Sequence, residues 1–485
     1  MLAVNLDTSS GTPVFKQLYE QIRNGILAGR LRSGTRLPAS RTLAADLGIS
    51  RTTVINALDQ LRAEGYIRGR VGSGTRVMPM LPETTMRIGL SADEIRRSVP
   101  SDGQPMRRIQ GRWPDSTAWT TSAARPLRPG NPDLNGFPRD LWAKLAAKYW
   151  RTVDPVVLGY SDPKGYLPLR AAIPEYLSRV RGVRCDVKQV LIVAGSQQAL
   201  HLCAQVVLKR GDIAWMEDPG YPGARAALIA AGARIVPKRV DAEGLVLPAR
   251  NDVARPKLIY VTPSHQCPLG VAMSVSRRLQ LIEFAAKNHA WIIEDDYYSE
   301  YRYFSRPIAA LQSLDRGGRV IYIGSVSKTL VPALRIGYII APSPLVDVFV
   351  RARQTADRQS GTIDQAVLAE LLTEGWLERH IRQTRIRYLE RQRALLDAIR
   401  TEMPDILEAA PSEAGMYLVA YIKKKGLTSS RAARWAAAHG VDVMPLSAFS
   451  IRPLAREGLV LGYGEFSVEE IRNAVRKLSR AFRDM

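Results

Sequence analysis

Five short apolar runs, separated by helical patterns, constrain the fold of this chain more than any other feature of its sequence. They are VLIVA at 190–194, IAWME at 213–217, KLIYV at 257–261, WIIED at 291–295 and VIYIG at 320–324. Short apolar runs that alternate with helices are typical of a mostly parallel sheet wrapped by helices. The chain from residue 125 onward is therefore expected to form an α/β domain.

The last apolar run leads into GSVSKTLVPALRIGY, residues 324–338, where Lys328 follows two serines and Arg335 lies seven residues further on. An amine for a Schiff base, with hydroxyl and guanidinium donors for a phosphate dianion, is what a pyridoxal-phosphate pocket requires. A lysine in a serine-rich loop is also common on a solvated surface. This stretch by itself leaves both interpretations open.

The run WIIEDDYYSEYRY at 291–303 ends in carboxylates and tyrosines. Asp295 at the carboxyl end of a buried strand would lie where α/β proteins keep their ligands, and could hold a cofactor ring nitrogen protonated. Tyr297 lies two residues on, on the same side of an extended chain, within reach of a ring hydroxyl. The alternative is a solvated strand end with clustered charge.

Two further stretches suit a phosphorylated, planar cofactor. In VAGSQQ at 193–198, Gly195, Ser196 and Gln197 open an apolar helix, and backbone N–H groups at a helix N-terminus bind anions. In EDPGYPG at 217–223, a turn presents Tyr221 for stacking on a flat ring. Each pattern alone is also that of an ordinary capped helix or a Gly/Pro turn.

The amino-terminal segment predicts a winged helix-turn-helix. The stretch VFKQLYEQIRNGIL at 14–27 has one apolar stripe at Val14, Leu18, Ile22 and Ile26. LPASRTLAADLGISRTTVINALDQLRAEGYI then predicts two helices around Gly48, with Ser40 and Ser50 as N-caps and the second helix at about 51–64. YIRGRVGSGTRVM at 66–78 predicts a two-stranded wing.

This module has the charge and the side chains for DNA. Residues 1–80 hold 11 Lys or Arg and 5 Asp or Glu. Arg51, Thr52 and Thr53 open the second helix, from which they reach base edges or phosphates of the major groove. Arg70 and Gly72 lie at the wing tip, near the minor groove. A minority of winged helices bind proteins instead.

The periodicities divide the chain into parts. Residues 1–78 form the predicted winged helix-turn-helix, 79–124 a linker, and 125–485 the effector domain, with a large part at about 125–341 and a smaller carboxyl-terminal α/β part at about 342–485. Arg107 and Arg108 in the linker are minor candidates for DNA contact.

Composition points to a nucleic-acid partner in a reducing compartment. With 69 Lys and Arg against 46 Asp and Glu, the chain carries a formal net charge of +23, which favours polyanions. We expect no membrane attachment, signal peptide or metal site, because we find no long apolar run, no leader pattern and only three widely spaced cysteines. The expected location is the cytoplasm, on the nucleoid when DNA is bound.

In the order of their motifs, the stretches around Ser196, Tyr221, Asp295 and Lys328 resemble the fold type I aminotransferases. With LPASRTLA, ISRTTV and GYIRGRVGSGT, the whole chain from about 13 to 481 resembles the MocR/GabR subfamily of GntR regulators. The resemblance implies pyridoxal 5'-phosphate as the cofactor and a head-to-tail homodimer. It also implies roles for individual residues: an internal aldimine at Lys328, a ring-nitrogen partner at Asp295, a phenolic partner at Tyr297, a stacking ring at Tyr221, phosphate contacts from Ser196, Gln197, Ser325 and Arg335, a contact from Tyr160 to the partner subunit's phosphate, and DNA contacts from Arg41, Arg51 and Thr53.

Three departures from this family pattern bear on function. Cys267 stands where catalytic relatives carry an asparagine that holds the ring oxygen, and thiols hydrogen-bond poorly. LVLGYGEFS lacks the arginine that clamps a substrate carboxylate, with Gly462 at about the expected place and Arg452 as the nearest substitute, although a surface arginine is the commoner case. Leu58 replaces a frequent tyrosine and is expected to affect packing.

The sequence therefore favours a pyridoxal-phosphate-dependent transcriptional regulator. An amine or amino-acid-like effector, or the cofactor itself, would change operator binding, with little or no transaminase turnover. The alternatives are an active aminotransferase that carries a DNA-binding module and a sensor for which the cofactor is the signal. The sequence does not indicate which effector binds, which genes are regulated, or whether they are activated or repressed.

Overall fold

The computed structural model describes residues 4–7, 10–70, 74–79, 125–248, 255–304 and 308–483, except for the side chain of Arg70. It divides into two compact units, Met1–Arg107 and Arg108–Met485. The predicted linker, apart from its first residue, lies outside the described residues, as do Gly72, Arg107 and Arg108. The two units are described separately.

The amino-terminal unit is a winged helix-turn-helix. It contains α1 (Val14–Leu27), β1 (Arg36–Leu37), α2 (Ser40–Leu47), α3 (Arg51–Ala63), β2 (Ile67–Arg70) and β3 (Gly74–Val77), with an antiparallel sheet in the order β1-β3-β2. Leu18, Ile22 and Ile26 bury the predicted stripe of α1 against the other two helices. Leu58 is buried in the same core, as expected of a packing residue.

The caps of the two central helices differ from each other. Ser50 caps α3 as predicted, because its hydroxyl accepts from the Thr53 N–H at 3.1 Å. The prediction that Ser40 caps α2 is wrong: the backbone stays extended through Ala39, which takes the N-cap position, and Ser40 is the first helical residue. Gly48 ends α2 with left-handed backbone angles, which glycine adopts without strain.

The second unit is built on an eight-stranded mixed sheet in the order β4-β11-β10-β9-β8-β5-β6-β7. All five apolar runs form strands: β4 (Val190–Val193), β5 (Ile213–Asp218), β8 (Leu258–Val261), β9 (Trp291–Asp296) and β10 (Val320–Ser325). The other strands are β6 (Arg234–Asp241), β7 (Gly244–Leu245) and β11 (Gly337–Ile340), and β7 and β11 pair antiparallel with their neighbours. The predicted α/β fold is thus confirmed.

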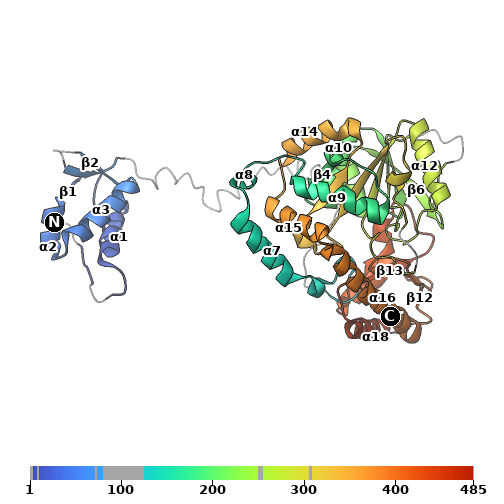
Figure 1. The fold of residues 1–485 in the computed structure, drawn as a ribbon. Coiled ribbons are helices and arrows are strands. Elements are labelled where there is room, and N and C mark those ends of the chain that lie inside the picture. The colour runs from blue at the N-terminus through green and yellow to red at the C-terminus, as the bar shows by residue number, and fades with distance from the viewer. Residues whose placement is uncertain are drawn as a thin grey trace. The chain divides into compact units, whose positions relative to one another are not determined.

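Helices cover both faces of this sheet (Figure 1). Residues of β10 point alternately to the two faces of the sheet. On one face, Ile321 and Ile323 pack with α10 (Ser196–Val207), α11 (Pro222–Ala230) and α14 (Val346–Ala356). Tyr322 packs on the opposite side, with α9 (Leu167–Arg181) and α15 (Thr362–Thr373). On that side, Val320 packs with α12 (Val275–Lys287) and α13 (Leu311–Leu314).

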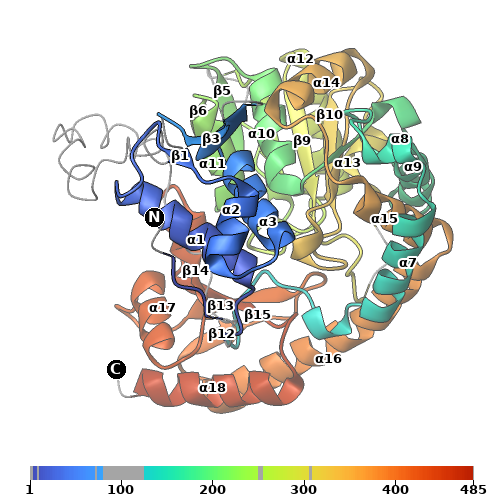
Figure 2. The ribbon, with the colours of Figure 1, turned by 90° about the vertical axis from the view of Figure 1, so that its left-hand side faces the viewer.

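The carboxyl-terminal part has its own antiparallel sheet, in the order β12-β13-β15-β14. Its strands are β12 (Leu407–Ala409), β13 (Tyr417–Ile422), β14 (Met444–Pro445) and β15 (Gly458–Gly462), and α17 (Ser429–Ala438) and α18 (Val468–Arg483) pack beside them. The long helix α16 (Trp376–Glu402) runs from the large part into this one and packs along α18, as Figure 2 shows.

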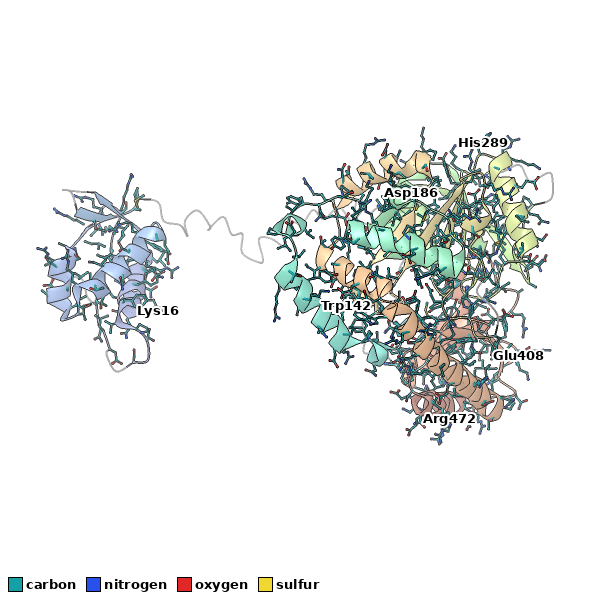
Figure 3. The ribbon with its side chains drawn as sticks, viewed as in Figure 1. Lys16, Trp142, Asp186, His289, Glu408 and Arg472 are labelled. Atoms are coloured by element: carbon teal, nitrogen blue, oxygen red, sulfur yellow. The ribbon has the colours of Figure 1, made fainter. Side chains whose placement is uncertain are left out.

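At the amino-terminal end of the second unit, α7 (Arg139–Thr152) and α8 (Pro155–Leu158) precede α9. Helix α7 packs on α15. In Figure 3, the labelled Trp142 lies on α7 and the labelled Arg472 on α18. No described helix is long and apolar enough to cross a lipid bilayer.

Candidate cofactor site and DNA-binding surface

A cavity of about 120 Å³ lies where the parallel strands end and the carboxyl-terminal sheet meets them. Its lining includes Lys328, Asp295, Tyr297, Tyr221 and Ser196, which sequence reasoning placed at one site. Asp295 lies at the end of β9, Tyr297, Tyr221 and Lys328 follow β9, β5 and β10, and Ser196 opens α10, so the carboxyl edge of the sheet and one helix start bring them together.

Lys328 supplies the amine of this cavity. It lies in the turn after β10, half-buried, and its Nζ donates to the Gly130 carbonyl oxygen. Burial removes hydration from the charged form and lowers the pKa of Lys328 to about 8, although the neighbouring groups Cys267 and Asp295 act in the opposite direction. A substantial fraction of the amine is therefore neutral, and nucleophilic, near physiological pH.

Asp295 supplies a carboxylate with one fixed hydrogen-bond partner. The Tyr260 hydroxyl donates to its Oδ2 at 2.9 Å. Burial raises the pKa of Asp295 to about 6, with the Tyr260 hydrogen bond and the Lys328 charge opposing that rise. A buried carboxylate in this state is suited to pairing with a cationic partner, such as a protonated ring nitrogen.

Strand alternation selects Asp295 from three successive acids, all of them buried rather than solvated. Glu294 and Asp296 point to the opposite face of β9. Glu294 accepts from the backbone N–H groups of Leu311 and Gln312, both at 2.8 Å. Asp296 accepts from Arg181 at 2.8 Å and from the Tyr322 hydroxyl at 2.7 Å. Both neighbours of Asp295 thus make their hydrogen bonds on the other face, although Asp296 Oδ1 has no partner there, and Asp295 alone of the three lines the cavity.

The start of α10 has the features of an anion site. Its N-cap residue is Gly195, which has φ +90° and no side chain that could accept hydrogen bonds from the first helical N–H groups. A Cβ at Gly195 would lie 3.2 Å from the Arg335 guanidinium, so glycine allows that group close to the helix start. Arg335 is exposed and donates to the Ala194 carbonyl at 2.6 Å.

Of the predicted phosphate contacts, Gln197 and Ser325, like Arg335, lie outside the cavity lining. Gln197 is exposed and donates to the Gly223 carbonyl at 3.0 Å. The Ser325 hydroxyl accepts from the Ser327 N–H at 3.1 Å and donates to the Ser327 hydroxyl at 3.0 Å. Their roles toward a phosphate stay predictions.

Phenol rings surround the site. The hydroxyls of Tyr297 and Tyr417 lie 2.8 Å apart, and both interact with the Cys267 thiol. Burial raises the pKa of Cys267 to about 12 and raises the pKa of Tyr297 and of Tyr221 above their usual value. All three groups therefore stay protonated and uncharged near neutral pH, so each can donate a hydrogen bond but none carries a negative charge.

Two predicted residues lie away from this cavity. Tyr160 is 86% exposed, and the Arg358 guanidinium lies 5.0 Å from the centre of its ring. Arg452 is exposed and lines a separate groove that also includes Asp218 and Tyr421, and its backbone N–H donates to Asp218 at 3.1 Å.

Gly462, where the sequence suggested a missing carboxylate-binding arginine, is closely packed against backbone. A Cβ at Gly462 would lie 2.3 Å from the Arg128 carbonyl oxygen and 2.5 Å from the Pro129 Cα, so no side chain fits there. The expectation of a missing arginine at about Gly462 stays a prediction, and Val460 is the β15 residue that faces the cavity.

Sequence reasoning missed several lining residues. Tyr260 had a weak signal, as a lone tyrosine in an aliphatic strand beside β9. Gly130, Tyr417, Phe449 and Val460 come from segments far away in the chain, and no local pattern marks them as neighbours of Lys328.

On the amino-terminal unit, Arg41, Arg51 and Thr52 are exposed, at the starts of α2 and α3. Thr53 is half-buried, and its hydroxyl lies 2.8 Å from the hydroxyl of the N-cap residue Ser50. The Thr53 hydroxyl is therefore hydrogen-bonded within the cap of α3. Arg51 Nε lies 3.5 Å from the Ser40 hydroxyl. Arg70 ends β2, but its side chain and Gly72 lie outside the described residues.

The residues present fit pyridoxal phosphate. The cavity combines an amine of lowered pKa, a buried carboxylate and several phenol rings, and beside it lies an uncapped helix start with an arginine. These are the groups that a planar phosphorylated aldehyde with a ring nitrogen needs.

Family models match both units. Residues 15–77 match the bacterial regulatory proteins of the gntR family, and residues 131–478 match aminotransferase class I and II. The "probable rhizopine catabolism regulatory protein MocR" of Rhizobium meliloti is 40% identical over 480 residues, which covers 98% of this chain and 95% of that protein. The "HTH-type pyridoxine biosynthesis transcriptional regulator PdxR" of Corynebacterium glutamicum is 31% identical, covering 99% and 98%.

Solved structures of similar fold are aminotransferases. An α-aminoadipate aminotransferase from Thermus thermophilus, complexed with N-(5'-phosphopyridoxyl)-L-leucine, superposes with a TM-score of 0.68 at 31% identity, covering 78% of this chain and 94% of that one. A kynurenine aminotransferase from Pyrococcus horikoshii, in complex with PMP, also has a TM-score of 0.68, at 26% identity, covering 82% and 96%.

Proposed function

The chain belongs to the GntR family of bacterial transcriptional regulators, in the group with an aminotransferase class I and II domain, and we propose that an amine effector bound beside Lys328 changes how its dimer holds an operator. The observation that carries this proposal is the cavity that brings Lys328, Asp295 and Tyr221 together in a chain that also has a winged helix. The protein would act in the bacterial cytoplasm, where its operator lies.

DNA binding belongs to the amino-terminal unit. In our proposal, the first turn of α3 enters the major groove, where the exposed Arg51 and Thr52 contact bases or phosphates and Arg41 contacts the backbone. Thr53 contributes with its methyl group or its hydroxyl, which it shares with the Ser50 cap. The formal net charge of +23 adds a sequence-independent attraction to DNA.

Pyridoxal phosphate is the cofactor of the second unit. When bound, it supplies an aldehyde that condenses reversibly with primary amines, releasing water, and a ring that withdraws electrons. In our proposal, Lys328 presents a neutral amine, Asp295 keeps a ring nitrogen protonated, and Tyr221 covers one ring face. The start of α10 and Arg335 bind the phosphate.

The site favours capture of an amine over sustained transamination. Cys267 interacts with the phenol pair Tyr297 and Tyr417, where a thiol is a weaker hydrogen-bonding partner than an amide. Among the described lining residues, no arginine is present to orient a substrate carboxylate. Both features reduce the control of a substrate during proton transfer, while amine binding needs neither of them.

The proposed dimer uses the face around α7 and α8. Trp150, Val156, Leu158, Tyr160 and Leu167 are 54–86% exposed, which is unusual for so many large apolar side chains within a short segment. A second copy packed head-to-tail on this face would bury them and bring Tyr160 toward the partner's phosphate site. Two winged helices held by one dimer would then fit two half-sites of an operator.

Regulation requires that the effector bind two arrangements of the dimer with different affinities. The cavity lies between the large sheet and the carboxyl-terminal sheet, so its occupant contacts both parts of the unit, through Lys328 on one side and through Tyr417 and Val460 on the other. An occupant that favours one spacing of these parts thereby favours one arrangement of the winged helices.

Visible absorbance and operator binding test the proposal together. Purified protein with its cofactor should absorb in the range of a lysine-bound pyridoxal phosphate, and Lys328→Ala should lose that band and keep its fold by circular dichroism. The matched control Lys287→Ala, whose side chain is 72% exposed, should keep it. The effector response of operator binding should disappear with the band. A reconstituted wild-type protein without the band would contradict the role of Lys328, and steady turnover of an amino donor with a keto acid would favour the aminotransferase.

A further inference from the structure

We propose that the carboxyl-terminal helix α18, together with the lysine loop that follows β13, binds the phosphate backbone of DNA that flanks the operator. The inference rests on operator binding by the winged helix and goes beyond it, because it gives the second unit a DNA contact of its own. We call these side chains the basic surface: Arg472, Arg476, Lys477, Arg480 and Arg483 of α18, and Lys423, Lys424 and Lys425 of the loop.

Most of the excess positive charge of the chain lies outside its winged helix. Residues 125–485 hold 52 Lys or Arg against 36 Asp or Glu, whereas residues 1–80 hold 11 against 5. Capture of an amine by a cofactor needs no such excess. A protein surface with a large excess of one charge attracts polyanions and raises their local concentration. The second unit is therefore itself suited to a polyanionic partner.

Helix α18 concentrates this charge in one stripe. Residues 471–483 contain five basic side chains and no acidic one. Four arginines follow one another at intervals of four, four and three residues and so share one face of the helix: Arg472, Arg476, Arg480 and Arg483. All four are exposed, and Figure 3 shows the labelled Arg472 at the lower edge of the second unit.

The basic side chains of α18 have no acidic partners. On the neighbouring helix α16, by contrast, the exposed Arg400 pairs with Asp397 at 2.7 Å. Among the residues that the structure describes, no carboxylate lies within ion-pair distance of a basic side chain of α18. Arg476 donates to the amide oxygen of Asn473, which is neutral. The positive charge of this stripe is thus not offset by ion pairs within the protein.

The lysine loop continues the stripe beyond the end of α18. Arg483 lies 3.5 Å from the Glu402 carbonyl oxygen, and two residues later the Pro404 carbonyl oxygen accepts from Lys423 Nζ at 2.7 Å. The end of α16 therefore brings the end of α18 next to the loop, whose three lysines are exposed. Asp405, exposed at the same corner, offsets one of these charges.

The stripe suits duplex DNA in length and in chemistry. The distance from Arg472 to Arg483 is about 16 Å along the helix axis, at about 1.5 Å per residue. Duplex DNA of that length carries roughly ten phosphate charges, at one per about 1.7 Å. Guanidinium groups bind phosphates through pairs of hydrogen bonds, and contacts with phosphates carry no sequence information. The stripe can therefore bind flanking DNA of any sequence.

A membrane surface is the other common partner of a basic amphipathic helix, and the packing of α18 opposes it. Its apolar residues Ile471, Val475, Leu478 and Phe482 are at most 1% exposed, because they pack in the core of the second unit. A helix that lies on a bilayer inserts such residues into the lipid. Helix α18 would have to leave the core to do so, whereas DNA requires only its exposed arginines.

The position of α18 leaves the basic surface accessible in the proposed dimer. Figures 1 and 2 both show α18 and α8 at opposite ends of the second unit. A second copy that packs around α7 and α8 therefore does not cover the stripe. The winged helix of the same chain holds the operator, so flanking DNA is present at a high effective concentration, and a weak contact is enough.

Two DNA fragments test the inference on the full-length protein with its cofactor. One is an operator selected from random duplexes and trimmed to the shortest length that keeps binding. The other is the same operator extended by about 20 base pairs on each side, which adds phosphates without adding half-sites. Anisotropy of the labelled fragments gives dissociation constants at several salt concentrations. Wild-type protein should bind the extended fragment on the order of tenfold more tightly, and with a steeper salt dependence.

A triple variant locates the contact on the basic surface. Arg476→Gln/Arg480→Gln/Lys424→Gln removes three charges from exposed positions in α18 and the loop, and circular dichroism checks its fold. For the extended fragment, the slope of log affinity against log salt should fall by about 3, at about 0.9 per phosphate contact. The affinity for the trimmed operator should stay at the wild-type value.

A matched variant controls for net charge. Lys209→Gln/Arg210→Gln/Arg351→Gln also removes three exposed cations, and none of the three forms an ion pair within the described part of the chain. They lie on α14 or directly after α10, and Figures 1 and 2 both show these helices at the other end of the unit from α18. The difference between the two fragments should stay as in wild type.

The inference and the proposed function fail in different ways. Wild-type protein that binds both fragments alike, or equal losses in the two triple variants, would overturn the inference. Binding to phosphatidylserine vesicles that the α18 variant loses, with both DNA fragments unaffected, would assign the basic surface to lipid and overturn it as well. In each case the trimmed operator still binds and the proposed function stands. An operator affinity that responds to no amine would contradict the proposed function and leave this DNA contact intact.

Discussion

Replacing Asp295 with asparagine should stabilise the protein that lacks cofactor and destabilise the protein that holds it. In the cofactor-free fold, burial raises the pKa of Asp295 from 3.8 to about 6. A shift of about 2 pH units corresponds to about 3 kcal/mol, so the ionised carboxylate costs the fold about that much at pH 8. Asparagine removes the charge and still accepts a hydrogen bond from the Tyr260 hydroxyl.

The pH dependence fixes the sign of this effect. Because the carboxylate has a higher pKa in the folded than in the unfolded chain, its unfavourable contribution grows as pH rises from 3.8 to about 6 and is constant above that range. Cofactor-free Asp295→Asn should therefore exceed wild type by up to about 3 kcal/mol at pH 8, and by only about 0.5 kcal/mol at pH 4. With cofactor bound the order should reverse, because the carboxylate then has a cationic partner.

The assay is thermal unfolding of both proteins, with and without pyridoxal phosphate, between pH 4 and pH 8. Tyr260→Phe serves as a companion variant, because it removes the one fixed partner of the carboxylate and should destabilise the cofactor-free protein. A cofactor-free Asp295→Asn protein that is no more stable than wild type at pH 8 would refute the reasoning. The same holds for a difference that does not change with pH.

Three further predictions follow from individual side chains. The rate at which cofactor-free protein takes up pyridoxal phosphate should rise through about pH 8 and then level off, because burial lowers the pKa of Lys328 to about 8; a stopped-flow rate that is flat from pH 7 to 9.5 would contradict this. Arg51→Ala should weaken operator binding by roughly 1–3 kcal/mol in an anisotropy assay, while Arg62→Ala, whose guanidinium pairs with Asp59, should not; equal losses would remove Arg51 from the DNA surface. Trp150→Glu should shift the protein toward monomer in sedimentation velocity, because Trp150 is 64% exposed on the proposed dimer face, while Leu279→Glu on α12 should not.

Local patterns predicted the elements well, because strands and helices leave periodic signals in neighbouring residues. The stripe Leu18, Ile22 and Ile26 and the cap at Ser50 follow from spacing alone, and the structure confirms them. The cap predicted at Ser40 failed because the local pattern does not say which residue leaves the extended conformation first. The N-cap is the last residue before the helix with non-helical backbone angles, so a shift of one residue in the helix start changes which side chain can cap it.

The site was predictable only in part. Lys328, Asp295 and Tyr221 were recognisable because each ends or follows an element at the edge where parallel strands keep ligands. The wall formed by Tyr417, Phe449 and Val460 was not, because it comes from a second sheet whose contact with the first has no local signature.

The sequence by itself determined the kinds of elements, their order and the chemical groups available, because these depend on side chains close together in the chain. It determined that a basic winged helix precedes an α/β domain with one lysine suited to pyridoxal phosphate. Only the tertiary structure decided that backbone fills the space at Gly462 and that Val460 forms the wall of the cavity. These outcomes depend on strand alternation and on packing between distant segments, which fix where each side chain points and what it contacts.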